Sequence, residues 1–294
     1  MKEIKVSIIE AFAKQVKMGN PAGVIFDADS LSESQMQNIA KIVGFNESVF
    51  ILKSAVADMK LRYFTPNHEM NLCGHATIAS ISEFMKKNNI KESKSLTVET
   101  LAGIININYN ADLHEVTMTQ SPAKFKTFNG DLVELMSSIG LSIDDLDKNY
   151  PVIYGNTGIW TILIPIKHLE SFERMKPVNE KFSEILKEIP TASVHPFSLE
   201  TIYSYNDMHG RHFSASHSGT IEDPVTGTAS GVMGAYYITY IKDVRNVELM
   251  IEQGQEIGRD GQVKVSASKM NDGEIEVEIS GTSVFVEEIN LTIK

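Results

Sequence analysis

The sequence has one cysteine, one tryptophan and no long apolar run. A single thiol, Cys73, excludes an internal disulfide and any metal site that needs several thiolates. No apolar run approaches the ~18 residues that a membrane-spanning helix needs. The first residues also lack the long apolar segment of a secretion signal. We therefore expect a cytoplasmic protein that is not a membrane protein.

Basic residues are also scarce. The chain has 27 Lys and Arg against 38 Asp and Glu, a formal net charge of −11. Binding to nucleic acid requires a basic surface, so this balance argues against a nucleic-acid partner. A small anion can still bind, because one local site can oppose the field of the whole molecule.

The length and the pattern of the chain predict two domains. At 294 residues the chain suits two domains of about 150 residues each. Short strands bounded by turn residues dominate both halves, and one of them is expected at 201–205. An amphipathic helix is predicted over 32–43, with a cap at Ser30 or Ser32 and a stop at Gly44, and a polar-faced helix is predicted over 178–188. Two further helices, 74–86 and 227–241, are apolar or small on nearly every face, which predicts burial all round.

The two halves repeat one order of motifs. Residues 61–65 (LRYFT) lead to 73–76 (CGHA) and a buried helix. Residues 210–214 (GRHFS) lead to Asp223, then to 227–229 (GTA) and the other buried helix. We interpret this as two copies of one unit, and the predicted class is α+β: two pseudo-symmetric domains, each a curved, mostly antiparallel sheet wrapped around a central helix.

The predicted boundary lies where residues 120–122 (QSP) interrupt the pattern. The expected domains are residues 1–122 and 123–294, with terminal strands that are able to cross back to the first half. Each buried helix would begin at a glycine, Gly74 or Gly227. Helix N-termini expose unpaired N–H groups and partial positive charge, so both are candidate carboxylate sites. The alternative is that these glycines only permit tight loops.

Several motifs resemble, in order, those of the PhzC/PhzF (phenazine biosynthesis-like) family. They are 19–24 (GNPAGV), 46–50 (NESVF), 64–66 (FTP), 72–77 (LCGHAT) and 222–229 (EDPVTGTA), followed by Gln253-Gly254 and Gly258-Arg259. The resemblance implies the two-domain fold of diaminopimelate epimerase with the active site in the cleft between the halves. It also implies a homodimeric isomerase that moves a proton within a small carboxylate-bearing substrate, with no metal and no organic cofactor.

Glu47 matches the catalytic glutamate of the family and is the expected acid/base. Burial beside Val49 and Phe50 would raise the pKa of its carboxyl toward the range useful for proton transfer to carbon. The family usually has Ser-Glu-Thr here, whereas this chain has Asn46-Glu47-Ser48. That departure leaves the hydrogen-bond partner of the acid open.

His75 and Asp223 match family positions that line the same pocket. Near a positive helix end His75 should resist protonation and act as a neutral partner. The alternative for Asp223 is that it is an acid at a helix start with no functional role. The resemblance further implies substrate binding by Gly227 and Thr228, which match a Gly-Ser pair that binds a carboxylate. Asn20, Cys73 and Gly74 complete the expected substrate-binding set.

Cys73 leaves an alternative open. Epimerase relatives exchange protons between two thiols, and we interpret Asp223 as the residue at the second thiol position, so that chemistry is unavailable here. A buried structural thiol is expected instead. The alternatives are an amino-acid-type epimerase that uses Cys73 with Asp223 or Glu47, and a non-catalytic small-molecule binding protein with the same cleft. His209, His212 and His217 lack metal-ligand spacing, so no metal is expected.

Overall fold

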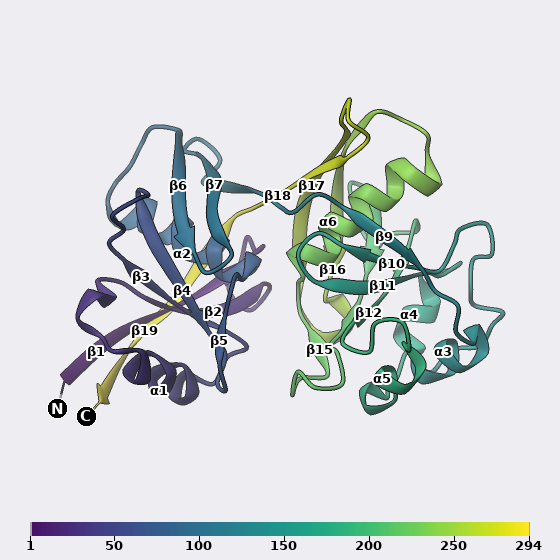
Figure 1. Cartoon of the computed structure of the whole chain (residues 1–294), viewed down its shortest axis with the longest axis horizontal. Helices are drawn as coiled ribbons and strands as arrows, with labels where there is room; N and C mark the ends of the chain where they lie inside the picture. Colours follow the sequence, from purple (N-terminus) through teal and green to yellow (C-terminus); the bar gives the residue numbers. More distant parts are fainter. Residues whose placement is uncertain (1, 294) are drawn as a thin grey trace. The chain divides into compact units, whose positions relative to one another are not determined.

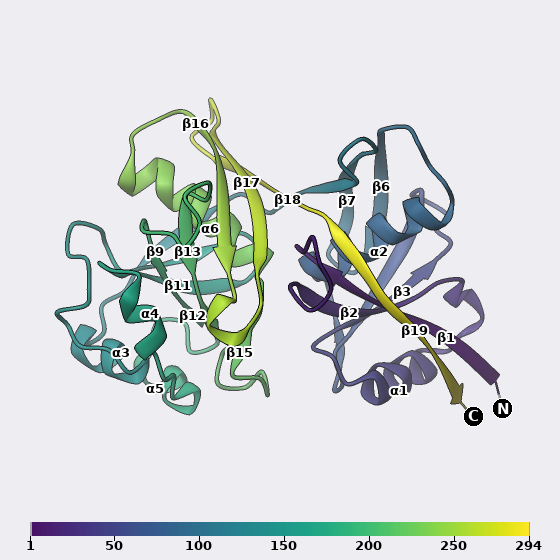
Figure 2. The ribbon, with the colours of Figure 1, turned by 180° about the vertical axis from the view of Figure 1, so that it is seen from behind.

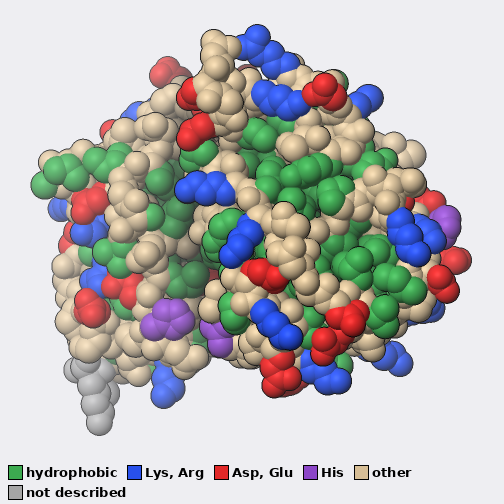
Figure 3. Space-filling view, turned by 45° about the vertical axis from the view of Figure 1, so that its right-hand side comes forward, with side chains coloured by type: hydrophobic (Ala, Val, Ile, Leu, Met, Phe, Trp, Pro, Cys, Tyr) green, Lys and Arg blue, Asp and Glu red, His purple; other side chains and the backbone are tan. Residues whose placement is uncertain are grey.

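The computed structural model describes residues 2–293, which divide into two compact units (Figure 1). The first unit comprises residues 2–119 together with 280–293, and the second comprises residues 120–279. None of the helices within 2–293 combines the length and the apolar character needed to cross a membrane. In Figure 3, Lys and Arg side chains lie among Asp and Glu on the visible face and form no continuous basic stripe there. The absence of a nucleic-acid partner stays a prediction.

The first unit is a mixed sheet with two helices. Its elements are β1 (Lys2–Ala11), β2 (Asn20–Ile25), α1 (Glu33–Val43), β3 (Ser48–Leu52), β4 (Met59–Phe64), β5 (Glu69–Met70), α2 (Gly74–Lys87), β6 (Lys94–Thr100), β7 (Gly103–Asn110), β8 (Glu115–Thr119) and β19 (Ser283–Ile293). β19 returns from the end of the chain to pair antiparallel with β1 (Figure 2). β2 pairs antiparallel with β1 but parallel with β3. β4 pairs antiparallel with β3 and parallel with β6, and β7 and β8 extend the sheet antiparallel.

The helix α2 is the centre of this unit. It packs against β1, β2, β3, β8 and β19, and every residue from His75 to Glu83 is buried. A helix that is buried on all faces needs small and apolar side chains all round, and the sequence provides them. The burial predicted for this helix is confirmed. The helix α1 begins after a capping box between Ser32 and Gln35 and ends at Gly44 in the left-handed conformation, as predicted.

The second unit is a second mixed sheet around a second helix. Its elements are β9 (Lys124–Thr127), α3 (Leu132–Ser138), β10 (Ile153–Asn156), β11 (Trp160–Pro165), α4 (Glu170–Arg174), α5 (Phe182–Ile185), β12 (Ser193–Ser198), β13 (Met208–Gly210), β14 (His212–Phe213), β15 (Glu222–Asp223), α6 (Gly227–Tyr236), β16 (Asn246–Gln253), β17 (Gly261–Lys269) and β18 (Ile275–Gly281), whose last residues belong to the first unit. The helix α6 packs against β10, β16 and β17 and continues as a π-helical turn over Tyr237–Ile241. Its residues from Ala229 to Tyr236 are buried, which confirms the second buried helix.

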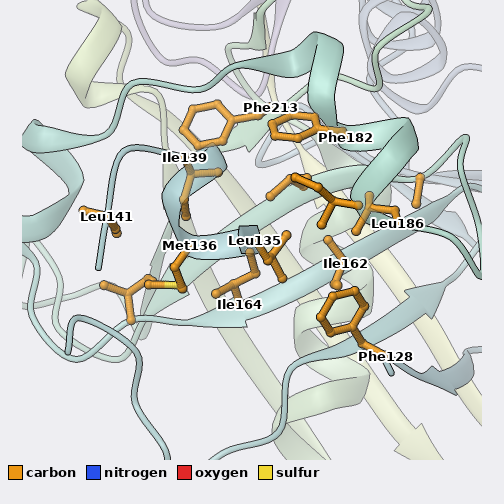
Figure 4. Close-up of a cluster of buried hydrophobic side chains, with 14 of the residues drawn as sticks. Phe128, Leu135, Met136, Ile139, Leu141, Ile162, Ile164, Phe182, Leu186 and Phe213 are labelled. Carbon is orange, nitrogen blue, oxygen red and sulfur yellow. The ribbon is translucent and has the colours of Figure 1, made fainter. Parts of the chain in front are cut away.

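A separate apolar cluster fills the space between α3, α4, α5 and the strands β11 and β12. Figure 4 shows Leu135 and Met136 of α3 and Ile139, which follows α3, among the side chains of this cluster, with Ile162 and Ile164 of β11 also labelled. The helix predicted over 178–188 is shorter than expected: a 3-10 turn over Asn179–Lys181 leads into one α-helical turn, α5. Phe182 and Ile185 of α5 pack in this cluster.

The strand predicted over 201–205 is wrong. The segment is a loop, and its backbone N–H groups at Ile202 and Tyr203 donate to the carboxylate of Glu252 at 2.5 and 3.2 Å. A buried carboxylate that captures these donors competes with strand pairing. The β-branched and aromatic residues of the segment gave the misleading strand signal.

Candidate active site

The start of α2 lies where two parallel strands begin. Asn20 is the first residue of β2, and Glu47 immediately precedes β3. Because β2 and β3 run parallel, with Gly23 opposite Ser48, both strands begin at the same end of the sheet. The helix α2 packs across both strands. This local topology places Asn20 and Glu47 beside the first turn of α2.

Glu47 and His75 are in direct contact. The carboxyl Oε2 of Glu47 lies 3.3 Å from Nε2 of His75, which is the second residue of α2. The side chain of Glu47 is 15% exposed, so it is shielded from bulk water without being sealed off. The backbone carbonyl of Glu47 accepts a hydrogen bond from the N–H of Gly23 at 3.3 Å, which ties the residue to β2.

His75 is neutral at physiological pH. Burial lowers the pKa of its imidazole to about 4, in agreement with the expectation from its place at a helix start. The amide Nδ2 of Asn20 lies 3.3 Å from Nδ1 of His75. When this amide donates to Nδ1, the ring proton sits on Nε2 and faces Glu47. The Glu47–His75 contact then places a ring N–H beside a carboxyl oxygen.

Cys73 forms the third side of this group. It is the N-cap residue of α2, it is 7% exposed, and its Sγ lies 3.5 Å from Nδ1 of His75. Its carbonyl accepts hydrogen bonds from both the N–H and the hydroxyl of Thr77, the latter at 2.7 Å. The residue therefore fixes the first turn of α2 and also holds its thiol beside the imidazole.

The start of α6 carries the other predicted residues. Asp223 ends β15, and its Oδ2 accepts a hydrogen bond from the hydroxyl of Thr226 at 2.5 Å. Thr226 is the N-cap of α6, and Gly227 and Thr228 are its first two residues. The position equivalent to Cys73 is thus Thr226, so the sequence interpretation that put Asp223 there is wrong. Counting back from each helix start makes Met70 the counterpart of Asp223.

Gln253 holds the loop between β15 and α6. Its side chain is fully buried, its Oε1 accepts from the N–H of Thr226 at 3.2 Å, and its Nε2 donates to the carbonyl of Asp223 at 2.7 Å. The next residue, Gly254, has φ +104°, and an added Cβ would lie 2.6 Å from the carbonyl oxygen of Pro224. Both residues of the Gln253-Gly254 motif therefore shape this loop. In the sequence this motif served only as part of the family resemblance, and its role in shaping the loop before α6 was not predicted.

Buried histidines form a second polar cluster in this unit. Nδ1 of His209 lies 3.0 Å from a carboxyl oxygen of Glu252, and its Nε2 lies 2.8 Å from one of Glu256. Burial lowers the pKa of His209, but the hydrogen bonds and charges of these carboxylates outweigh it and raise the value overall. His212 lies against His195, with 3.2 Å between their Nδ1 atoms, whereas His217 is exposed. Among the described residues, His209, His212 and His217 therefore do not form a group of possible metal ligands.

The predicted site residues thus form two local groups. Asn20, Glu47, Cys73, Gly74 and His75 meet at the start of α2 in the first unit. Asp223, Gly227 and Thr228 lie at the start of α6 in the second unit. The first group holds an acid, a neutral base and a thiol together, which is an arrangement suited to proton transfer.

The fold and the site define a class, the isomerases with the diaminopimelate epimerase-like fold. The crystal structure of a hydroxyproline epimerase from Agrobacterium vitis superposes with a TM-score of 0.66 over 98% of this chain and 92% of that chain. The sequence identity is 10%, so this similarity concerns the fold alone. The α+β class with two epimerase-like halves is confirmed.

The chain belongs to the PhzC/PhzF family of phenazine biosynthesis-like proteins, whose model matches residues 9–289. The "Uncharacterized isomerase YfhB" of Bacillus subtilis is 46% identical over 98% of both chains. The Bacillus anthracis phenazine biosynthesis protein of the PhzF family is 50% identical, and its crystal structure gives a TM-score of 0.96 over 100% of both chains. The protein is an enzyme of the isomerase class.

Proposed function

We propose that the protein is a cofactor-independent isomerase that moves a proton within a small carboxylate-bearing molecule. In this proposal Glu47 transfers the proton to and from carbon, and His75 is its neutral hydrogen-bond partner. The enzyme acts in the cytoplasm as a homodimer and uses neither a metal nor an organic cofactor.

The contact between Glu47 and His75 supports the proposal most directly. A neutral imidazole whose Nε2 lies 3.3 Å from one carboxyl oxygen positions the Glu47 side chain, and the other oxygen is proposed to meet a substrate. The contact is shielded but open to entry, since the Glu47 side chain is 15% exposed. Proton abstraction from carbon needs such a positioned base in a partly dry environment.

The start of α2 is proposed to bind the substrate. Its first-turn N–H groups, which include that of Gly74, are suited to a carboxylate, and the helix dipole adds favourable potential. Asn20 and Cys73 line the reacting end beside His75. The roles expected of Asp223, Gly227 and Thr228 at the start of α6 stay predictions.

The proposed reaction conserves atoms and electrons. The Glu47 carboxylate takes a proton from a carbon, and the C–H electron pair moves into a new double bond within the conjugated acid. An existing double bond shifts in turn, and its far carbon receives the proton back from Glu47. No electrons leave the substrate, so no redox partner is needed.

Solvent exchange tests this function. Candidate amino- or hydroxycyclohexadiene carboxylates are incubated with the enzyme in deuterium oxide, and proton NMR follows label incorporation at carbon. The proposal expects incorporation that depends on the enzyme. A ligand that binds tightly, stays chemically unchanged and exchanges no proton would instead favour a non-catalytic binding protein.

The second candidate function is an epimerase in which Cys73 carries the proton at an α-carbon. It is favoured by one observation, the 3.5 Å contact between the thiol and Nδ1 of His75, which could activate the thiol. This candidate expects Cys73→Ser to abolish solvent exchange. The isomerase proposal expects a modest loss, because serine nearly keeps the size of cysteine and Glu47 still carries the proton.

A further inference from the structure

We propose that Glu47, Cys73 and His75 form a binding site for one thiophilic divalent cation, Zn²⁺, and that its occupancy inhibits the enzyme. One ligand atom of each residue lies within 4.8 Å of the others. The residues come from the loop before β3 and from the first turn of α2, so rigid elements hold all three. Only the inhibitory consequence rests on the proposed function.

The distances suit a tetrahedral ion. With metal–ligand bonds of about 2.0–2.3 Å, Zn²⁺ separates its ligand atoms by roughly 3.3–3.6 Å. Oε2 of Glu47 lies 3.3 Å from Nε2 of His75, and Sγ of Cys73 lies 4.0 Å from the same nitrogen. Binding requires the thiol, which lies 3.5 Å from Nδ1, to turn toward Nε2. The partial exposure of Glu47 leaves room for water as the fourth ligand.

The chemistry of the three ligands selects the ion. Sulfur, imidazole nitrogen and carboxylate oxygen together suit Zn²⁺, whereas Mg²⁺ prefers six oxygen ligands. The thiol releases its proton to the buffer on binding, and thiolate plus carboxylate then balance the charge of the cation. A neutral complex avoids the cost of burying net charge.

Asn20 supplies the supporting contact that metal-bound histidines usually have. Its side-chain amide lies 3.3 Å from Nδ1 of His75. With Zn²⁺ on Nε2 the ring proton moves to Nδ1, and rotation of the amide by half a turn presents its oxygen to that proton. Asn20 thus hydrogen-bonds to Nδ1 of His75 both without the cation and with Zn²⁺ on Nε2.

Occupancy of this site and proton transfer exclude each other. The cation takes the carboxyl oxygen and the ring nitrogen whose contact supports the proposed chemistry. Zn²⁺ is therefore expected to suppress solvent exchange at about one equivalent, and a chelator is expected to restore it.

Cobalt spectroscopy tests binding without any substrate. The full chain is freed of metal with a chelator and titrated with Co²⁺, which reports thiolate ligation through a charge-transfer band. Because the chain has one cysteine, that band can come only from Cys73. We expect saturation at one equivalent, displacement by Zn²⁺, and no response to Mg²⁺.

Variants assign the other two ligands. Glu47→Gln and His75→Gln are each expected to weaken Co²⁺ affinity at least about tenfold. His68→Gln, which alters an exposed histidine of the same unit, is the control and is expected to bind Co²⁺ normally. Circular dichroism confirms folding of each variant.

Two results would overturn the site: no thiolate band with the wild type, or unchanged affinity in both Glu47→Gln and His75→Gln. Exchange that continues with Zn²⁺ bound would overturn the inhibition. Loss of exchange in the metal-free wild type would count against the proposed function alone, because the binding assay contains no substrate.

Discussion

Arg62 donates two hydrogen bonds to Glu69, from Nε and Nη2, each at 2.6 Å. The pair joins β4 to β5, and Glu69 lies five residues before the first residue of α2. The guanidinium also lies 5.2 Å from the ring centre of Phe64. The Arg62–Glu69 ion pair therefore stabilises the β4–β5 hairpin that leads into α2.

The second unit repeats this arrangement. Arg211 donates to Glu222 from Nε at 2.9 Å and from Nη2 at 2.6 Å, and Glu222 lies five residues before Gly227. The guanidinium lies 4.9 Å from the ring centre of Phe213. The repeated motif read from the sequence thus corresponds to a repeated Arg–Glu clasp in front of each helix.

Removing one partner of the second clasp should destabilise its unit. Arg211 and Glu222 side chains are each 8% exposed, so Arg211→Met leaves a buried carboxylate without its cation. We expect a loss of about 3–5 kcal/mol in the free energy of unfolding. Fluorescence of Trp160, the single tryptophan, follows unfolding of this unit in urea.

The double variant Arg211→Met/Glu222→Met is the matched control. It removes both charges, and we expect it to recover much of the lost stability. A single variant that loses under about 1 kcal/mol, or a double variant that is less stable than the single, would contradict the account of the clasp.

Gln253 is predicted to set the stability of the loop before α6. Gln253→Leu leaves the N–H of Thr226 and the carbonyl of Asp223, both part-buried, without this partner, at a cost of about 1 kcal/mol for each. We expect a lower thermal midpoint by calorimetry. Gln262→Leu, at a half-buried glutamine on β17, should change it little. Equal midpoints for the two variants would show that the contacts of Gln253 are not needed.

Acid should destabilise the second unit through His212. Burial lowers the pKa of His212 to about 4, against an ordinary value of 6.5. The unfolded chain therefore binds a proton below pH 6.5 that the folded chain refuses until about pH 4. The stability contribution is fully present above pH 6.5 and falls by up to about 3 kcal/mol toward pH 4.

His212→Gln removes this titration. The stability difference between wild type and variant, measured by Trp160 fluorescence in urea, is expected to shrink as the pH falls from 7 to 4. His195, which lies 3.2 Å away and whose pKa burial also lowers, keeps part of the acid sensitivity in both proteins. A difference that stays constant with pH would mean that His212 titrates normally.

The sequence predicted the parts of the fold that local patterns encode. The cap at Ser32, the stop at Gly44 and the two buried helices follow from residue type and spacing. The strand expected at 201–205 failed because its backbone donors bind Glu252, which is distant in sequence. A contact between residues this far apart cannot be predicted from a short stretch of sequence.

The site could be predicted residue by residue but not as a set of contacts. Motif positions selected Glu47, His75 and Cys73, and their mutual distances emerge only when β3 packs beside α2. Asn20 was expected to contact substrate, which stays a prediction, and the structure places its amide 3.3 Å from Nδ1 of His75. The side chain of Gln253 acts on a loop about 30 positions earlier in the chain, which spacing alone does not reveal.

The central claim is that Glu47 carries the proton. The most direct test compares Glu47→Gln with Glu83→Gln, which alters a buried glutamate of α2 in the same unit. Both changes keep the side-chain size. Deuterium incorporation into the substrate at carbon should fall about 10²–10⁴-fold in Glu47→Gln and stay near wild type in Glu83→Gln. Undiminished incorporation in Glu47→Gln would contradict the account.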